Sequence, residues 1–233
     1  MKLAIMQPYF FPYIGYFQLI NSVDEFVIYD NIQFTRKGWI NRNRILLNGQ
    51  DAYVSLPLKK DSDYLQVKER FLADTWDSER KKMLRRIEES YRKAPFFKET
   101  YGVIETCIMY EDSNLFNFIL HSVKQIINHL NIKTALLISS TIPIDHQLKS
   151  EEKVMAICKC READIYINPI GGLELYDKEH FKKNNLELQF QKANNIKYPQ
   201  FKNEFVPWLS IIDVMMFNRT EEITSYLNDY SIV

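Results

Sequence analysis

The chain has 233 residues, 46% of them hydrophobic, which is enough to bury one large core or two smaller ones. Lys and Arg total 30, as do Asp and Glu, so the formal net charge is zero. No overall field therefore favours nucleic acid or an acidic membrane surface, and we expect neither as a partner.

The opening residues show no basic start, apolar run and small-residue cleavage site in succession, and the uncharged stretches are shorter than a membrane span. We therefore expect a cytoplasmic protein without membrane insertion. The three cysteines are too few for a disulfide framework, and Cys158 and Cys160 have neither a second pair nor a nearby histidine that would complete a metal site. Reduced thiols and no metal are expected.

Strand and helix patterns alternate from the start of the chain. Residues 2–7 and 24–32 read as apolar strands, and residues 14–23 between them have the length of a short helix. If the two strands are parallel neighbours, the turn after the first lies at the carboxyl edge of the sheet, where α/β folds place ligands. The later elements expected are a β-hairpin over 44–60 with its turn at Asn48-Gly49, helices over 76–91 and 115–131, a strand over 134–141, a helix over 150–163 with Ser150 as its N-cap, strands over 164–172 and 186–191, and a helix near 207–218.

This pattern predicts a single α/β domain over residues 1–233. Its Rossmann-like sheet is flanked by helices, and the hairpin and a helical segment at about 61–131 are inserted in it or packed beside it.

The opening stretch AIMQPYFFPYIGYFQLI (residues 4–20) places a rigid turn between strand and helix. Pro8 and Pro12 fix their own φ angles and keep the preceding residues out of the helical region, and Gly15 permits close backbone approach. Pro12–Tyr16 resembles the P-x-H-x-G-H turn of Rossmann-like (HIGH-type) nucleotidyltransferases, with tyrosine at both histidine positions.

Neutral phenols cannot replace the charge that those histidines supply to the α-phosphate, so nucleotidyl transfer at this turn is doubtful. A phosphate or sugar group at the helix N-terminus remains a hypothesis, with Gln7, Tyr13 and Tyr16 as its binding residues. The alternative is that these aromatic residues only pack in the core.

Several separated blocks together resemble the WbqC-like family: MQPYFFPYIGYFQLI, NIQFTRKGWINRNRI, INPIGGLELYDKEHF, KYPQF and FVPWLSIIDVMMFN. The blocks run from residue 1 to about 218. The resemblance implies a bacterial cytoplasmic protein associated with the biosynthesis of O-antigen or another surface polysaccharide. Some relatives carry the label of glycine transferase or sugar-modifying enzyme.

The second block combines cationic, aromatic and amide side chains. In an extended segment Trp39, Asn41 and Asn43 share one face and Arg42 and Arg44 the other. Arginine can hold phosphate or carboxylate in a bidentate fork, and tryptophan can stack on a sugar or base. The substrate-binding candidates here are Lys37, Trp39, Asn41, Arg42 and Asn43. The alternative is a solvated charged loop.

Further candidates lie in the second half of the chain. The backbone amides of Gly171 and Gly172 can face an anion, with Tyr176 close behind, although a plain tight turn explains the glycine pair equally well. Asp213 interrupts an apolar run and His180 follows the glycine turn, so both are candidate general bases. Lys159 is a candidate ligand of phosphate or carboxylate, or a surface lysine.

Two hypotheses of function follow. In the first, the protein transfers an acyl or aminoacyl group, such as glycine, to a phosphate-bearing small molecule, a nucleotide-activated sugar; ATP and an acyl or aminoacyl carrier are the candidate cofactors. In the second, it is a noncatalytic sugar- or nucleotide-binding or assembly protein on a degenerate nucleotidyltransferase scaffold. The sequence leaves the oligomeric state open.

Overall fold

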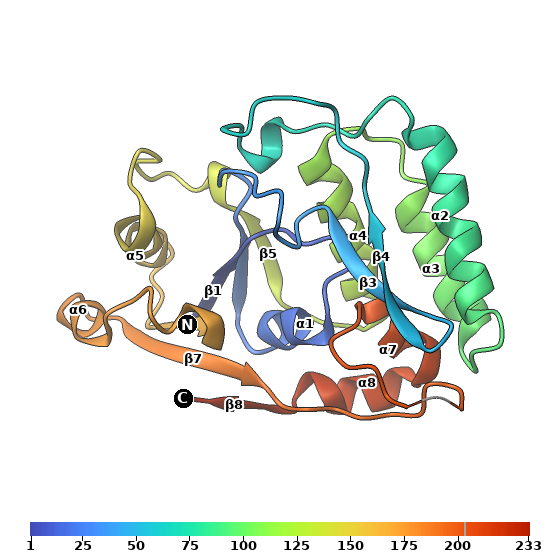
Figure 1. The fold of residues 1–233 in the computed structure, drawn as a ribbon. Coiled ribbons are helices and arrows are strands. Elements are labelled where there is room, and N and C mark those ends of the chain that lie inside the picture. Colours follow the sequence, from blue (N-terminus) through green and yellow to red (C-terminus); the bar gives the residue numbers. More distant parts are fainter. Residues whose placement is uncertain (203) are drawn as a thin grey trace.

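The computed structural model describes residues 1–202 and 204–233, in which six strands form one sheet in the order β5-β2-β1-β6-β7-β8 (Figure 1). The strands are β1 (Lys2–Met6), β2 (Glu25–Ile28), β5 (Ala135–Ile138), β6 (Ile165–Pro169), β7 (Glu187–Ala193) and β8 (Tyr230–Ile232). All neighbouring pairs are parallel except β7 and β8.

The strand order is that of a Rossmann-like sheet. Numbered in chain order, the parallel strands stand third, second, first, fourth, fifth across the sheet. β2 and β5 lie on one side of β1, and β6 and β7, which come later in the chain, lie on the other side. The order reverses between β1 and β6, and a crevice at the carboxyl ends of the strands is expected at such a switch point. The Rossmann-like prediction is confirmed.

Apolar runs produce these strands because both faces of the sheet are covered. In β1, Leu3 and Ile5 belong to one buried cluster and Ala4 to the other, so successive side chains enter opposite cores. In β2, Val27 belongs to the same cluster as Leu3 and Ile5, and Phe26 belongs to the same cluster as Ala4.

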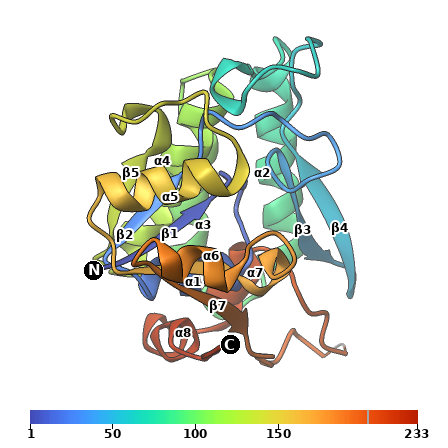
Figure 2. The ribbon, with the colours of Figure 1, turned by 90° about the vertical axis from the view of Figure 1, so that its left-hand side faces the viewer.

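Helices cover the two faces unequally. The helices are α1 (Ile14–Asn21), α2 (Trp76–Tyr91), α3 (Phe97–Ile108), α4 (Leu115–His129), α5 (Ser150–Cys160), α6 (Lys178–Lys183), α7 (Ile211–Phe217) and α8 (Thr220–Leu227), with short 3₁₀ turns η1 (Val67–Glu69), η2 (Ser139–Thr141) and η3 (Ile170–Gly172). The smaller cluster packs under α5 and α6, and the larger cluster holds the buried residues of the other helices. Figure 2 shows α5 in front of β1 and β2. Among the described residues, no helix is both long enough and apolar enough to cross a bilayer.

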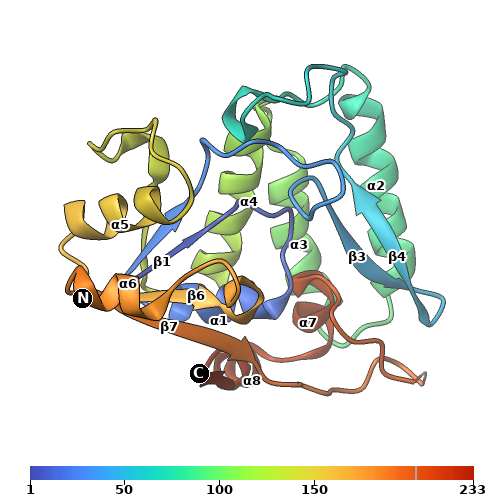
Figure 3. The same ribbon diagram turned by 60° about the vertical axis from the view of Figure 1, so that its left-hand side comes forward.

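The predicted hairpin forms outside the sheet, from β3 (Arg42–Leu47) and β4 (Gln50–Ser55), and lies beside α2 (Figure 3). Its turn residues Asn48 and Gly49 have φ angles of 52° and 78°, the left-handed conformation that a tight hairpin turn requires at both central positions.

Several expectations need correction. Helix α3 lies within the helical segment expected at about 61–131 but was not predicted as an element of its own. Its inward side combines Thr100, Ile104, Cys107 and Ile108, and the polar threonine and the glycine at 102 weaken its apolar pattern. Elements α6, α8 and β8 were also not expected. Ser150 is the first residue of α5 with a φ of 46°, whereas the N-cap is Lys149. Strand β2 ends at Ile28 and so is shorter than the predicted 24–32, although the next residue, Tyr29, still donates its backbone N–H to the Met6 carbonyl at 2.8 Å.

Candidate functional site

A cleft of about 1010 Å³ opens at the carboxyl ends of β1, β2 and β6. Gln7 follows β1, Asn31 follows β2, and Asn168 lies near the end of β6. The first turn of α5 closes one side with Ser150 and Lys153. We call this space the switch-point cleft, since it lies where the strand order reverses. Its size is at the upper end of ordinary small-molecule sites.

The lining of this cleft combines apolar surface with two lysines and several hydrogen-bonding groups. Lys149, Lys153 and His146 face it, together with the phenols of Tyr9, Tyr29 and Tyr176, and among the described residues no Asp or Glu lines it. A ligand with negative charge therefore meets cations and hydrogen-bond donors there without repulsion from a carboxylate at the wall.

Lys153 is the most unusual of these residues, because this lysine is only 5% exposed. Its Nζ lies 5.0 Å from the centre of the Tyr29 ring and 3.5 Å from the carbonyl oxygen of His146. Within the described residues it takes part in no ion pair. Burial lowers the pKa of Lys153, and the carboxylate of Asp30 acts in the opposite direction.

A chain of hydrogen bonds fixes His146. Ser139 Oγ donates to Asn31 Oδ1 at 2.9 Å, which leaves the Asn31 amide nitrogen, 3.0 Å from His146 Nδ1, as the donor to that ring. His146 then carries its own proton on Nε2. The sequence offered no partner for His146, because Asn31 is far from it along the chain.

The turn after β6 forms the floor of the cleft near Tyr176. Tyr166 OH donates to Asn168 Oδ1 at 3.0 Å, and Asn168 Nδ2 donates to the Pro169 carbonyl at 3.0 Å. A Cβ atom on Gly172 would lie 1.9 Å from Asn168 Nδ2, whereas one on Gly171 would meet open space. Of the predicted binding residues, the structure thus brings together Gln7, Gly171, Gly172 and Tyr176.

Tyr13 and Tyr16, the two tyrosines predicted to bind a ligand, do not line this cleft. Tyr16 is 3% exposed, and its hydroxyl donates to the Gln7 carbonyl at 3.0 Å. Tyr13 packs edge-on against Trp208, with 6.0 Å between ring centres, and its ring covers Gly15, where a Cβ would lie 2.4 Å from it. Burial raises the pKa of both phenols, so both remain neutral. Their geometry supports the core-packing alternative.

The basic and aromatic block also lies apart from the cleft, on the hairpin. Arg42 donates to the carbonyls of Lys37 and Gly38, at 2.8 and 3.1 Å, and its guanidinium lies 5.0 Å from the centre of the Tyr53 ring. The Arg42 guanidinium therefore already donates hydrogen bonds within its own loop.

The expected division of faces in this block is wrong. The Trp39 ring stacks on Tyr53 and lies under Arg44, so it shares a face with the arginines. The reason is that the strand begins at Arg42, and the alternation does not extend back to Trp39. Asn43 points inward and donates to the Phe10 carbonyl, while Asn41 donates to the Leu56 carbonyl. Lys37 is exposed.

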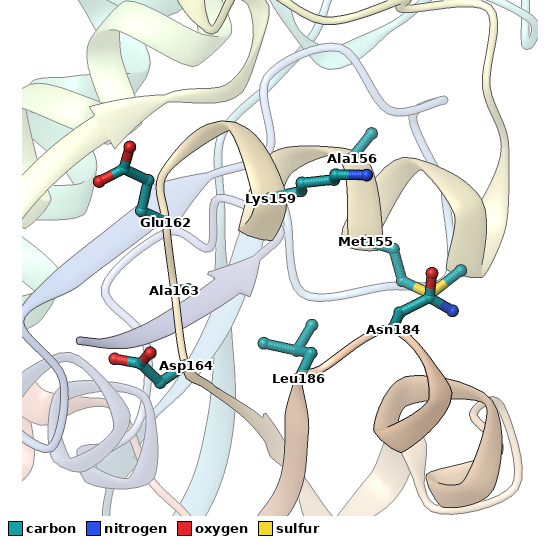
Figure 4. A pocket seen from close by; sticks show the side chains of 8 residues that line it. All are labelled: Met155, Ala156, Lys159, Glu162, Ala163, Asp164, Asn184 and Leu186. Atoms are coloured by element: carbon teal, nitrogen blue, oxygen red, sulfur yellow. The ribbon is translucent and has the colours of Figure 1, made fainter.

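Lys159 lies in a different, smaller pocket of about 340 Å³ at the far end of α5 (Figure 4). Glu162 and Asp164 line the same pocket, beside Asn184 and Leu186. Two carboxylates next to one lysine do not favour an anionic ligand. Lys159 is exposed, in agreement with the alternative of a surface lysine.

The two candidate bases lie neither together nor in the cleft. Asp213 has no exposed surface and accepts hydrogen bonds from Tyr91, Tyr198 and Gln200 at 2.8, 2.7 and 2.6 Å. It is a buried structural carboxylate that no ligand reaches in this conformation. His180 is exposed on α6 and pairs with Glu151 of α5, which ties the two helices together.

Comparison with known proteins agrees with the blocks seen in the sequence. The sequence model of the WbqC-like protein family matches residues 7–225. The chain belongs to the WbqC-like protein family. It is 29% identical over 230 residues to the uncharacterized protein Rv1507c of Mycobacterium tuberculosis (strain ATCC 25618 / H37Rv), covering 97% of each chain. No solved structure matches it significantly.

Sequence reasoning missed several residues of the cleft in this WbqC-like chain, namely Tyr29, Asn31, His146 and Lys153. One signal was available: Asp30 and Asn31 are polar residues directly after a buried strand, at the edge where α/β folds bind ligands. Nothing in the sequence marked Lys153, because its burial depends on how α5 packs.

Proposed function

We propose that this WbqC-like protein is a transferase of bacterial surface-polysaccharide (O-antigen) biosynthesis that adds an acyl or aminoacyl group, such as glycine, to a nucleotide-activated sugar in the cytoplasm. The observation that carries the proposal is the switch-point cleft, which has the size of a small-molecule or cofactor site and is lined, among the described residues, by two lysines and by no carboxylate. Family membership supports the pathway only as an association.

The position of the cleft favours a nucleotide-bearing ligand. In open α/β sheets of this strand order, ligands bind beyond the carboxyl ends of the strands at the reversal of strand order. Tyr9, Tyr29 and Tyr176 offer flat apolar surfaces for a base or a sugar ring, and the lysines offer charge for phosphate.

The transfer itself requires few protein groups. An amine on the sugar attacks the carbonyl carbon of the acyl donor, a C–N bond forms, and the bond to the leaving group breaks as the amine gives up a proton. The donor is an acyl or aminoacyl carrier, or an acyl group activated with ATP. His146 offers a neutral N–H for the oxygen that becomes negative, because Asn31 occupies its other nitrogen.

A thermal-stability screen tests the ligand class. ATP, CTP, nucleotide-linked sugars, free amino acids and acyl or aminoacyl carriers are added singly, and a nucleotide sugar at about 100 times its Kd should raise the midpoint by roughly 5 to 10 °C. Gln7→Leu, in the cleft, should reduce that shift, whereas Arg42→Ala, on the hairpin, should retain it.

Mass spectrometry of the nucleotide sugar after incubation with each donor tests the chemistry. The expected product is an acylated or glycylated sugar that His146→Ala forms more slowly. A midpoint shift without product from any donor would contradict the transferase and favour the noncatalytic binding protein. No shift with any nucleotide sugar would contradict the ligand class.

A further inference from the structure

Lys153 is a buried cation that forms no ion pair within the part of the chain that the structure describes, although the Asp30 carboxylate is near enough to raise its pKa. The residue is 5% exposed, and its Nζ donates to the carbonyl oxygen of His146 at 3.5 Å. The nearby Asp30 carboxylate accepts hydrogen bonds from the backbone N–H and the hydroxyl of Ser140, at 2.8 and 2.5 Å. Burial of an ammonium without a paired charge is costly, so a site that retains one has a use for it.

The start of α5 adds positive potential at the same place. The first N–H groups of an α-helix have no partner inside the helix. No side chain of the described residues caps α5, and its N-cap Lys149 itself lines the cleft. Glu151 and Glu152 belong to the same turn but do not line the cleft, and the Glu151 carboxylate pairs with His180. The Lys68 ammonium is near enough to lower the pKa of Lys153 further.

We propose that the first turn of α5, with Lys149 and Lys153, is the phosphate subsite of the switch-point cleft and holds the diphosphate of the nucleotide-activated ligand. This inference rests on the proposed function for the nature of the ligand. A phosphate oxygen pairs with the Lys153 ammonium, and the backbone N–H groups at the helix start donate hydrogen bonds to further phosphate oxygens.

Residues from both sides of the switch point line the cleft beside this turn. Tyr29 follows β2, whereas Gly171 and Tyr176 follow β6. The rest of the ligand therefore has residues of both sides within the same cleft as the phosphate subsite.

Isothermal titration with inorganic pyrophosphate, UDP and uridine tests the subsite in the full chain. Lys153→Gln should weaken pyrophosphate and UDP binding by at least about tenfold, since a hydrogen bond to a charged group is lost, and should leave uridine unaffected. Lys159→Gln, a lysine of the same helix that lies outside the cleft, is the matched control and should bind all three like the wild type.

Thermal unfolding without ligand separates binding from folding. Lys153→Met should unfold at or above the wild-type temperature, because it removes an unpaired buried charge and keeps the volume. Pyrophosphate should then raise the wild-type midpoint and leave that of the variant unchanged.

The two proposals fail separately. Nucleotide-sugar binding of equal strength in wild type and Lys153→Gln would overturn the subsite and leave the proposed function standing. Pyrophosphate binding that depends on Lys153, with no nucleotide sugar bound by the wild type, would support the subsite and overturn the proposed ligand class. No pyrophosphate binding by the wild type would overturn the subsite.

Discussion

Gly171 and Gly172 are neighbours in the chain with opposite surroundings. A methyl group on Gly172 would collide with the amide of Asn168, which is 6% exposed and held by Tyr166 and the Pro169 carbonyl. A methyl group on Gly171 would meet open space. The sequence predicts a glycine turn here, but only the structure shows which glycine is required.

Gly172→Ala is therefore expected to lower the free energy of unfolding by about 1 to 3 kcal/mol, the usual cost of overpacking, and to weaken ligand binding by displacing Asn168. Urea unfolding and ligand titration measure the two effects. Gly171→Ala is the control and should change the stability by no more than about 0.5 kcal/mol. Equal losses for the two substitutions would contradict this assignment.

At the scale of elements, Asp213 connects segments that are distant in the chain. Its carboxylate on α7 accepts from Tyr91 at the end of α2, and the Tyr91 hydroxyl accepts in turn from the Leu46 amide of β3. Gln200, which donates to Asp213, also accepts from the Val206 amide. One buried carboxylate thus fixes the hairpin, a helix and the loop before α7 to one another, which explains a charge inside an apolar run.

Burial raises the pKa of Asp213 from 3.8 to about 6, against the lowering effect of its three hydrogen bonds. The folded state then binds the proton more tightly than the unfolded state, so this group's contribution to stability falls as the pH rises from about 4 to about 6. The expected change is at most about 3 kcal/mol.

Urea unfolding between pH 4 and 7 measures this contribution. Asp213→Asn cannot titrate, so the stability of the wild type relative to the variant should decline across that interval. Parallel curves for the two proteins would show that Asp213 does not titrate there.

For the molecule as a whole, the strand order decides where a ligand binds. Residues 29–33, 146–153 and 168–176 meet at one edge of the sheet, although they are far apart in sequence. The loops at 21–24, 161–164 and 184–187 lie at the opposite ends of the same strands and helices.

Hydrogen exchange with and without a nucleotide sugar should therefore show slower exchange in the first three segments and no change in the last three. The readout needs no substitution and locates the ligand directly. Slower exchange confined to the hairpin, residues 42–55, would instead place the ligand on the basic and aromatic block.

The sequence by itself determined the local elements of this protein. Apolar runs gave the parallel strands, Asn48-Gly49 gave the hairpin turn, and residues 76–91 form α2 with the predicted bounds. These predictions succeed because each signal lies in residues that are close together in the chain. The signals are a left-handed φ at a turn and apolar residues at helical spacing. The separate blocks of the WbqC-like family were also readable without coordinates.

Only the tertiary structure decided which residues share a site. Local pattern does not determine on which side of β1 the strand β6 is added, and that choice creates the switch-point cleft. It brings Gln7 and the glycine pair together, leaves Arg42 on the hairpin, encloses Asp213 and buries the ammonium of Lys153. Burial and counter-ion pairing are properties of packing between distant segments, and so the residue that we consider most informative had no signature in the sequence.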